Sequence, residues 1–180
     1  MTATAPPPPD DDESRFTRWL AEHGAIPRKL SRAYAFEAAD AEELHQEMLV
    51  QLWRSLPRFR GQSQEVTWIY RVCLNTALTG QRQRRRREAR VVTTTPPVET
   101  EAPEANPADV HERDDRLRLL MEAIHTLPPG ERSLIVLALD GLSHREIGEI
   151  TGQTENHVGV ALLRARRKLS TLLKGAQDEF

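Results

Sequence analysis

Basic residues crowd two places in the 180-residue sequence, and both have the chemistry of a phosphate contact. The first is the run QRQRRRREAR, which holds Arg82 and the arginines at 84–87. The second is ALLRARRKL near the C-terminus, with Arg164, Arg167 and Lys168. Cations at a helix end also complement the helix dipole. Five arginines exceed that need, so we expect the first run to follow a nucleic-acid backbone.

In front of the C-terminal cations, LSHREIGEITGQTENHVGV joins two short helical patterns through Thr151 and Gly152. Two helices joined by a tight turn containing Gly form a helix-turn-helix, which presents its second helix to the DNA major groove. Asn can pair with adenine there, and Val methyls can touch a thymine methyl. The spacing alone fits a plain helical hairpin equally well. The candidate DNA contacts are Thr154, Glu155, Asn156, His157, Val160, Arg164, Arg167 and Lys168.

Catalytic and metal-binding patterns are missing from the sequence. It has a single cysteine, Cys73, six scattered histidines and no carboxylate cluster, so we expect no cofactor and no enzymatic activity. A nucleic-acid enzyme such as a nuclease therefore has no support. No apolar run approaches the roughly 18 residues of a membrane helix, and the N-terminus does not read as a secretory signal. We expect a cytoplasmic protein without membrane insertion.

The net charge of −2 conceals blocks of opposite sign. Residues 26–90 hold 13 basic and 7 acidic residues, whereas residues 91–115 hold 1 basic and 7 acidic. Such segregation suggests a module that binds a polyanion beside an acidic tether.

The elements that must position these residues read as helices throughout, and no alternating pattern is long enough for a strand. We expect an all-α chain with a disordered acidic, Pro-rich tail at 1–13 and a helical domain at 14–90. A flexible acidic Pro-rich linker at 91–112 would lead to a helix-turn-helix domain at 113–175. Two apolar stripes define the first core: Leu44, Met48, Leu52 and Leu56, then Val66, Ile69, Tyr70, Cys73 and Ala77.

Capping residues are expected to set several helix boundaries. Asp40 with Glu43, and Ser143 with Glu146, have the spacing of capping boxes. Ser63 is positioned to cap the helix that follows it, and Gly141 to end the helix before it.

Two segments in order resemble the extracytoplasmic-function (ECF) sigma factors of bacterial RNA polymerase. The first is AEELHQEMLVQLWRSLPRFRGQSQEVTWIYRVCLNTAL, similar to the family's core-binding and promoter-melting region. The second is LPPGERSLIVLALDGLSHREIGEITGQTENHVGVALLRARRKL, similar to its −35-reading region. The motifs F-R-G, T-W-I-Y-R, L-N-T-A and R-A-R-x-x-L, found together and in order, make the resemblance specific.

The resemblance implies partners and roles for individual residues. It implies core RNA polymerase as a partner, through the clamp helices of the largest subunit and the flap of the second-largest subunit. The clamp-facing residues would be Leu44, Gln46, Glu47 and Gln51. The −10 contacts would be Arg60, Gln62, Ser63, Gln64, Arg71, Asn75, Arg82, Arg85 and Arg86. Trp68 lies in the same region, where it would stack on bases or, as we expect, join the core.

The function implied is a sigma factor that directs core polymerase to promoter DNA and melts it, with no catalytic step of its own. A helix-turn-helix regulator that acts without polymerase is the alternative. An anti-sigma factor stays open as a further partner.

Overall fold

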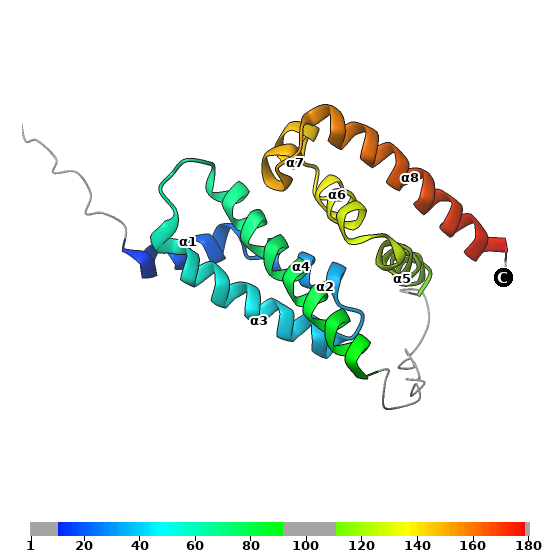
Figure 1. The fold of residues 1–180 in the computed structure, drawn as a ribbon, viewed down its shortest axis with the longest axis horizontal. Helices are drawn as coiled ribbons and strands as arrows, with labels where there is room; N and C mark the ends of the chain where they lie inside the picture. The colour runs from blue at the N-terminus through cyan, green and yellow to red at the C-terminus, as the bar shows by residue number, and fades with distance from the viewer. Residues whose placement is uncertain (1–10, 92–110, 179–180) are drawn as a thin grey trace, which may run out of the picture. The chain divides into compact units, whose positions relative to one another are not determined.

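The computed structural model describes residues 11–91 and 111–178, and every regular element among them is a helix (Figure 1). The all-α prediction is therefore confirmed. The chain divides into two compact units with the boundary between Ala77 and Leu78, inside one long helix.

The first unit contains α1 (Asp12–His23), α2 (Ala25–Tyr34), α3 (Ala38–Ser55), the 3-10 turn η1 (Leu56–Arg58) and the start of α4 (Glu65–Val91). Helix α2 packs along α3. All the elements of the first unit contribute to one core. Its fully buried side chains include Trp19, Leu30, Met48, Leu56, Ile69 and Cys73. The two predicted stripes supply half of the buried apolar side chains of this unit. Met48, Leu52 and Leu56 on one side and Ile69, Tyr70, Cys73 and Ala77 on the other are buried, whereas Leu44 and Val66 are half-buried.

Cys73 lies in the middle of this core with no exposed surface. Burial raises the pKa of the Cys73 thiol to about 12, since an apolar surrounding disfavours the charged thiolate.

Two predicted caps of the first unit are wrong. Helix α3 begins at Ala38 after Glu37, so Asp40 lies inside the first turn and forms no capping box with Glu43. Ala38 and Ala39 are strong helix formers, so the helix begins two residues before Asp40. The negative charge of Asp40 is favourable in this first turn, near the positive end of the helix dipole. Similarly, α4 begins at Glu65, so Ser63 lies too early to cap it.

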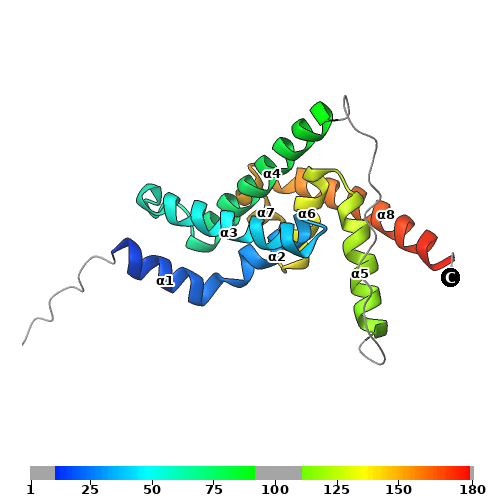
Figure 2. The same ribbon diagram turned by 90° about the horizontal axis from the view of Figure 1, so that it is seen from below.

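The second unit contains the rest of α4, followed by α5 (His111–Thr126), α6 (Pro129–Leu139), α7 (His144–Thr151) and α8 (Glu155–Asp178), which Figure 2 shows from below. The long helix α8 packs against α5, α6 and α7. Ile124, Leu137, Ile147, Val158 and Leu162 are fully buried between them. Gly141 follows α6 with a φ of 82°, and its amide donates to the carbonyl of Ala138, as the predicted helix end requires.

A buried arginine joins α5 to α6. The guanidinium of Arg132 donates to the carbonyl oxygens of His125, in the last turn of α5, and of Leu127, just after that helix. Carbonyl groups in the last turn of a helix have no hydrogen-bond donor within that helix. Arg132, on the next helix, provides the donor.

The predicted linker falls mainly on residues 92–110, and the predicted tail on residues 1–10, both outside the described residues. The helices begin and end close to the expected boundaries, since α4 runs to Val91 and α5 starts at His111. At the N-terminus, Asp11 caps α1 by accepting a bond from the Ser14 amide, so ordered structure begins within the segment expected to be a tail.

Candidate nucleic-acid interface

The helix-turn-helix corner starts from a complete capping box. The Ser143 amide donates to the Glu146 carboxylate at 2.7 Å, and the Glu146 amide donates to the Ser143 hydroxyl oxygen at 3.3 Å. The hydrogen bonds from Ser143 lower the pKa of Glu146 below its usual value. The predicted box is confirmed, and it sets the first residue of α7.

Two glycines make the turn between α7 and α8 possible. Gly152 ends α7 with a φ of 73°, in the left-handed region. The amide of Gln153 then donates to the Gly148 carbonyl at 3.0 Å. A Cβ on Gly148 would lie 2.6 Å from the carbonyl oxygen of Gln153, so the corner has no room for one. The sequence predicted Gly152 but not Gly148.

The start of α8 is fixed by Thr154, whose hydroxyl accepts a bond from the His157 amide at 3.3 Å. Thr154 therefore caps the helix, a role beside its predicted DNA contact. Val158 and Leu162 are buried with Ile147 and Ile150 where α7 packs on α8, as the sequence predicts.

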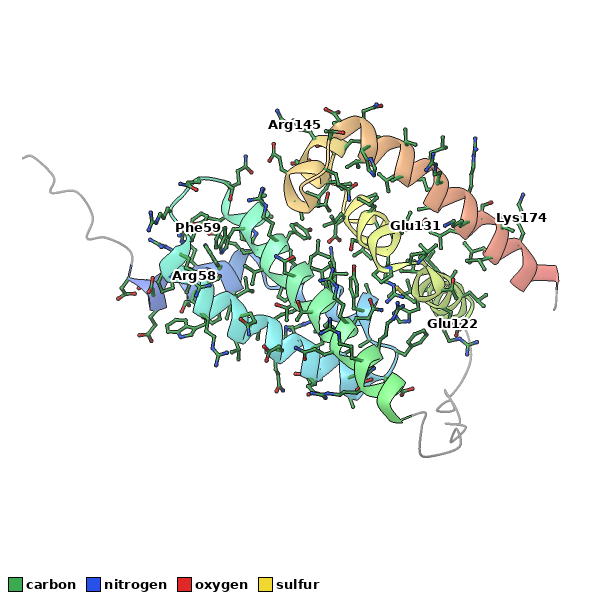
Figure 3. The ribbon with its side chains drawn as sticks, viewed as in Figure 1. Arg58, Phe59, Glu122, Glu131, Arg145 and Lys174 are labelled. Carbon is green, nitrogen blue, oxygen red and sulfur yellow. The ribbon has the colours of Figure 1, made fainter. Side chains whose placement is uncertain are left out.

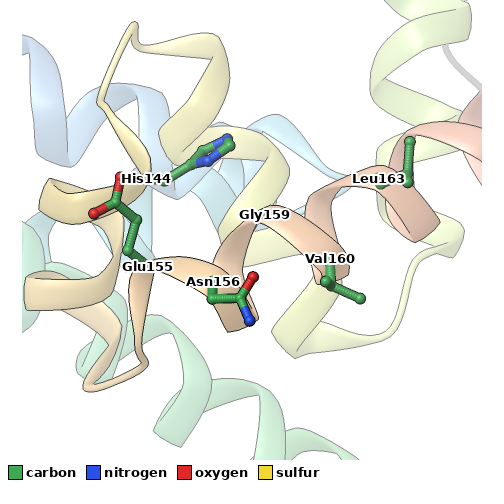
Figure 4. A pocket seen from close by; sticks show the side chains of 6 residues that line it. All are labelled: His144, Glu155, Asn156, Gly159, Val160 and Leu163. Carbon is green, nitrogen blue, oxygen red and sulfur yellow. The ribbon is translucent and has the colours of Figure 1, made fainter.

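The opposite side of α8 is exposed and largely uncharged. Asn156, Val160, Leu163 and Arg167 follow one another at intervals of four, three and four residues, which places them on one side of the helix. A shallow hollow opens there (Figure 4). Its lining consists of His144, Glu155, Asn156, Gly159, Val160 and Leu163. Of these, His144, Gly159 and Leu163 were not among the predicted contacts.

The cations after the hollow differ in their surroundings. Arg164 and Arg167 are exposed on α8. Lys168 instead binds both carboxylate oxygens of Glu131 on α6, at 2.6 and 2.9 Å. Lys168 therefore ties α8 to α6, and its charge is less available to a phosphate than its sequence position suggested.

The predicted −10 residues on α4 share one side of that single helix. Arg71, Asn75, Arg82, Arg85 and Arg86 fall within an arc of about 100° at the 3.6-residue period, whereas Arg84 and Arg87 lie well outside it. Asn75 and the later arginines are exposed, and Arg71 is half-buried. This side of α4 can follow a phosphate backbone and offer one amide to a base.

The loop before α4 is anchored by an aromatic cluster that the sequence did not reveal. The Phe59 ring lies 5.4 Å from that of Trp19 and 5.6 Å from that of Trp68. Trp68 also donates from its Nε1 to the Ser55 hydroxyl at 3.0 Å, so it belongs to the fold, as expected. Arg58 and Phe59 stand at the start of the loop in Figure 3. Beyond this anchor, Arg60, Gln62 and Gln64 are exposed and Ser63 is half-buried.

The predicted polymerase-facing residues lie along α3. Gln46 and Glu47 are exposed, Leu44 and Gln51 are half-buried, and Gln51 donates to Glu47 at 2.7 Å. Two large apolar side chains on this helix are also exposed. Val50 and Trp53 stand beside the predicted residues, and the Trp53 ring packs edge-on against Phe16 at 5.3 Å. The sequence pattern did not predict this patch.

Within residues 11–91 and 111–178, no three His, Cys, Asp or Glu side chains are placed to hold a metal ion. None of the helices described there has both the length and the apolar character needed to cross a bilayer.

Comparison with known families matches two separate segments of the chain, and the first of them extends past the unit boundary at Ala77 along α4. Residues 11–87 match Sigma-70 region 2, and residues 117–169 match Sigma-70, region 4. The ECF RNA polymerase sigma-E factor of Haemophilus influenzae is 30% identical over 169 residues, covering 84% of this chain and 80% of the relative. The ECF RNA polymerase sigma factor SigG of Mycobacterium tuberculosis is 31% identical over 164 residues. That match covers 78% of this chain but only 44% of the relative's length.

Solved structures share the fold. The sigma factor RpoE of Bartonella quintana, in complex with the anti-sigma factor NepR, superposes with a TM-score of 0.72 at 24% identity, over 89% of this chain and 97% of that one. CnrH, in complex with the cytosolic domain of CnrY, gives a TM-score of 0.63 at 21% identity, over 91% and 90% of the two chains.

Proposed function

The chain belongs to the ECF RNA polymerase sigma factor family, and on this premise we propose that it joins core RNA polymerase, recognises the −35 and −10 promoter elements and melts the second. One observation carries the proposal: two regions of the family match in order along the chain, the first on residues 11–87 and the second on residues 117–169. The polymerisation chemistry would remain with the polymerase.

The exposed face of α3 is the proposed docking surface for the clamp helices of the largest subunit. Val50 and Trp53 provide apolar area, and Gln46 and Glu47 surround it with polar groups. An apolar centre with a polar rim is typical of protein interfaces. Core polymerase should therefore retain the full-length chain in a pull-down and release it when Trp53→Glu is introduced.

The loop Arg60–Gln64 and the exposed side of α4 are the proposed −10 contact. The loop would capture an extruded base, and Asn75 would offer its amide nearby, which helps offset the cost of unpairing. Asn75→Ala should weaken promoter opening by on the order of 1–3 kcal/mol while polymerase binding stays normal.

Permanganate footprinting of the −10 region measures that opening. Gln83→Ala is the matched control, because it removes an exposed amide from another side of the same helix. Normal opening combined with lost polymerase association would remove Asn75 from the proposed site.

The second unit is the proposed −35 reader, assisted by the flap of the second-largest subunit. The segment from Thr154 to Leu163 has neither Lys nor Arg. Phosphate neutralisation supplies most non-specific DNA affinity, roughly 10⁻⁴–10⁻⁶ M for ordinary binding proteins, so the free chain should bind a promoter at the weak end of that range. Within holoenzyme the second contact becomes effectively intramolecular, at an effective concentration in the millimolar range.

Fluorescence anisotropy with a promoter duplex, with and without core polymerase, tests the function as a whole. We expect tight, sequence-selective binding only when polymerase is present. Selective binding by the free chain below about 10⁻⁸ M would instead favour a regulator that acts without polymerase.

An anti-sigma factor is a further proposed partner. The support is indirect: the RpoE structure contains an anti-sigma factor, and the CnrH structure contains a cytosolic domain of a second protein. Copurification with this chain, followed by loss of run-off transcription on adding the purified partner, would establish the interaction.

A further inference from the structure

We propose that the hollow at the start of α8 receives the 5-methyl group of a thymine in the major groove, so that the second unit selects an A·T pair through apolar contact. The inference rests on the proposed function, because it assigns a ligand to the face that would read the −35 element.

The hollow has an apolar floor on an exposed helix. Val160 and Leu163 are 45% and 52% exposed, although both carry large apolar side chains. Figure 4 shows them on the same stretch of α8, with Asn156 one turn earlier. An apolar group that enters this hollow would cover surface that water now contacts, which is favourable in proportion to the area covered.

One wall of the hollow comes from α7 rather than α8. Because Gly159 has no side chain, the His144 imidazole lies against this part of α8. A Cβ built on Gly159 would be 3.4 Å from His144 Nδ1 and 3.5 Å from Cε1. The imidazole therefore occupies space that a larger side chain at position 159 would need. It forms the wall of the hollow on the α7 side.

The polar groups around the hollow favour DNA over an apolar protein segment as the occupant. Asn156 and the Glu155 carboxylate both line the hollow, and both can bond base edges, Asn to adenine and Glu to the amino group of cytosine. Arg164 and Arg167 lie on the exposed surface about one and two turns after Val160, where phosphate contact is natural. In the major groove, the apolar group that distinguishes one base pair from the others is the thymine methyl. Val160 and Leu163 in the hollow can therefore make an apolar contact with the thymine methyl group.

Replacing thymine by deoxyuridine tests the inference, because it removes the methyl group and keeps the hydrogen-bonding edge. Holoenzyme assembled from core polymerase and the full chain first selects promoters from a randomised library, which defines the −35 element. Each thymine of that element is then replaced singly, and promoter occupancy is measured by competition. We expect one position at which the replacement lowers occupancy about fourfold, the transfer value of one buried methylene group.

Protein variants connect that thymine to the hollow. Leu163→Ala and Val160→Ala should bind the thymine and deoxyuridine promoters nearly equally, because the methyl group loses its contact. Leu172→Ala is the matched control, since Leu172 is 41% exposed on the same helix and does not line the hollow. It should keep the fourfold preference. Circular dichroism checks that each variant is folded.

The outcomes separate the two proposals. Holoenzyme that selects no −35 element would overturn the proposed function itself. A defined −35 element in which no thymine responds to deoxyuridine would overturn the inference alone, as would a response that persists in both alanine variants. The deoxyuridine series uses the unaltered chain, so a variant that fails to fold does not remove the test.

Discussion

The two regions that we propose contact DNA are built in opposite ways. The side of α4 that carries Arg71 and Asn75 continues into an arginine-rich end, and an exposed polar loop precedes the helix. The exposed side of α8 begins with Asn156, Val160 and Leu163, and its first cation is Arg164. One region is charged and preceded by a loop, whereas the other is nearly neutral and formed by a rigid corner.

The difference separates affinity from selectivity. Contacts to phosphates supply affinity with little sequence information, whereas contacts to base edges supply selectivity. The charged side of α4 suits a strand that is being opened, since its backbone stays charged in any conformation. The neutral side of α8 suits a duplex whose base edges must be compared. Substitutions in each region test this contrast. The largest effect is expected at Phe59, which holds the loop before α4, and the smallest at Arg167 and Lys168 on α8.

Phe59→Ala should have the largest effect, because the ring joins the loop to Trp19 and Trp68. We expect a loss of about 2 kcal/mol in unfolding free energy, somewhat below the ~3–5 kcal/mol for a fully buried Phe side chain, because the Phe59 ring is half-buried. Promoter opening should fall with it. Urea unfolding and permanganate footprinting measure the two effects.

Arg58→Ala, at the exposed neighbouring residue, is the control for this change and should alter stability by no more than about 0.5 kcal/mol. If Phe59→Ala were equally mild, the aromatic cluster would not be what anchors the loop.

Gly148→Ala should disrupt the helix-turn-helix corner, because a Cβ would meet the Gln153 carbonyl oxygen at 2.6 Å. We expect a cost of about 2 kcal/mol from overpacking. Selection of the −35 element should be lost, while binding of core polymerase through the first unit remains. Thermal unfolding and promoter selection by holoenzyme give the two readouts.

Gly159→Ala is the comparison at the corner, since its Cβ would meet only the movable His144 side chain at 3.4 Å. It should leave the unfolding free energy nearly unchanged. Equal destabilisation by both changes would contradict the special requirement at Gly148.

Arg85→Gln combined with Arg86→Gln should weaken promoter binding about tenfold at physiological salt, through the loss of two phosphate contacts. The slope of log affinity against log salt should become shallower by about 1.5. The pair Arg84→Gln and Arg87→Gln removes the same charge from another side of α4 and should have a smaller effect. Similar slopes for the two pairs would show that the charge acts without a defined side.

Arg167→Gln should give the smallest effect, about fivefold in holoenzyme affinity with a salt slope shallower by about one. Lys168→Gln should change the slope less, because Glu131 already neutralises that cation. Its effect on stability should stay below about 1 kcal/mol, as for other exposed ion pairs. A slope change as large as that of Arg167 would make Lys168 a phosphate contact after all.

Local patterns predicted much of the fold. Stripes of apolar residues, the Ser143–Glu146 box and Gly152 each carry their signal within a few residues. The box and Gly152 are confirmed, and the two stripes of the first unit are confirmed except at Leu44 and Val66, which are half-buried. The wrong predictions of caps at Asp40 and Ser63 show the limit of such signals. Helix α3 begins two residues before Asp40, and α4 begins two residues after Ser63.

The features that were missed depend on residues distant in sequence or on a neighbouring backbone atom. Phe59 gains its role from Trp19, 40 positions earlier, and Lys168 gains its partner from Glu131, 37 positions earlier. Gly148 matters because of one carbonyl oxygen across the turn. A pattern of residue types contains none of this information. The contacts with DNA and with polymerase stay predictions until the binding and footprinting experiments are done.

The buried thiol of Cys73 has a consequence for how this chain can receive oxidative signals. Peroxides and disulfides react with thiolates, and a pKa of about 12 leaves on the order of one thiolate in 10⁵ near neutral pH. The sequence has no second cysteine with which a disulfide could close inside the chain. Cys73 is therefore poorly placed to sense a change in cellular redox state, so Cys73→Ala should leave any such response in place.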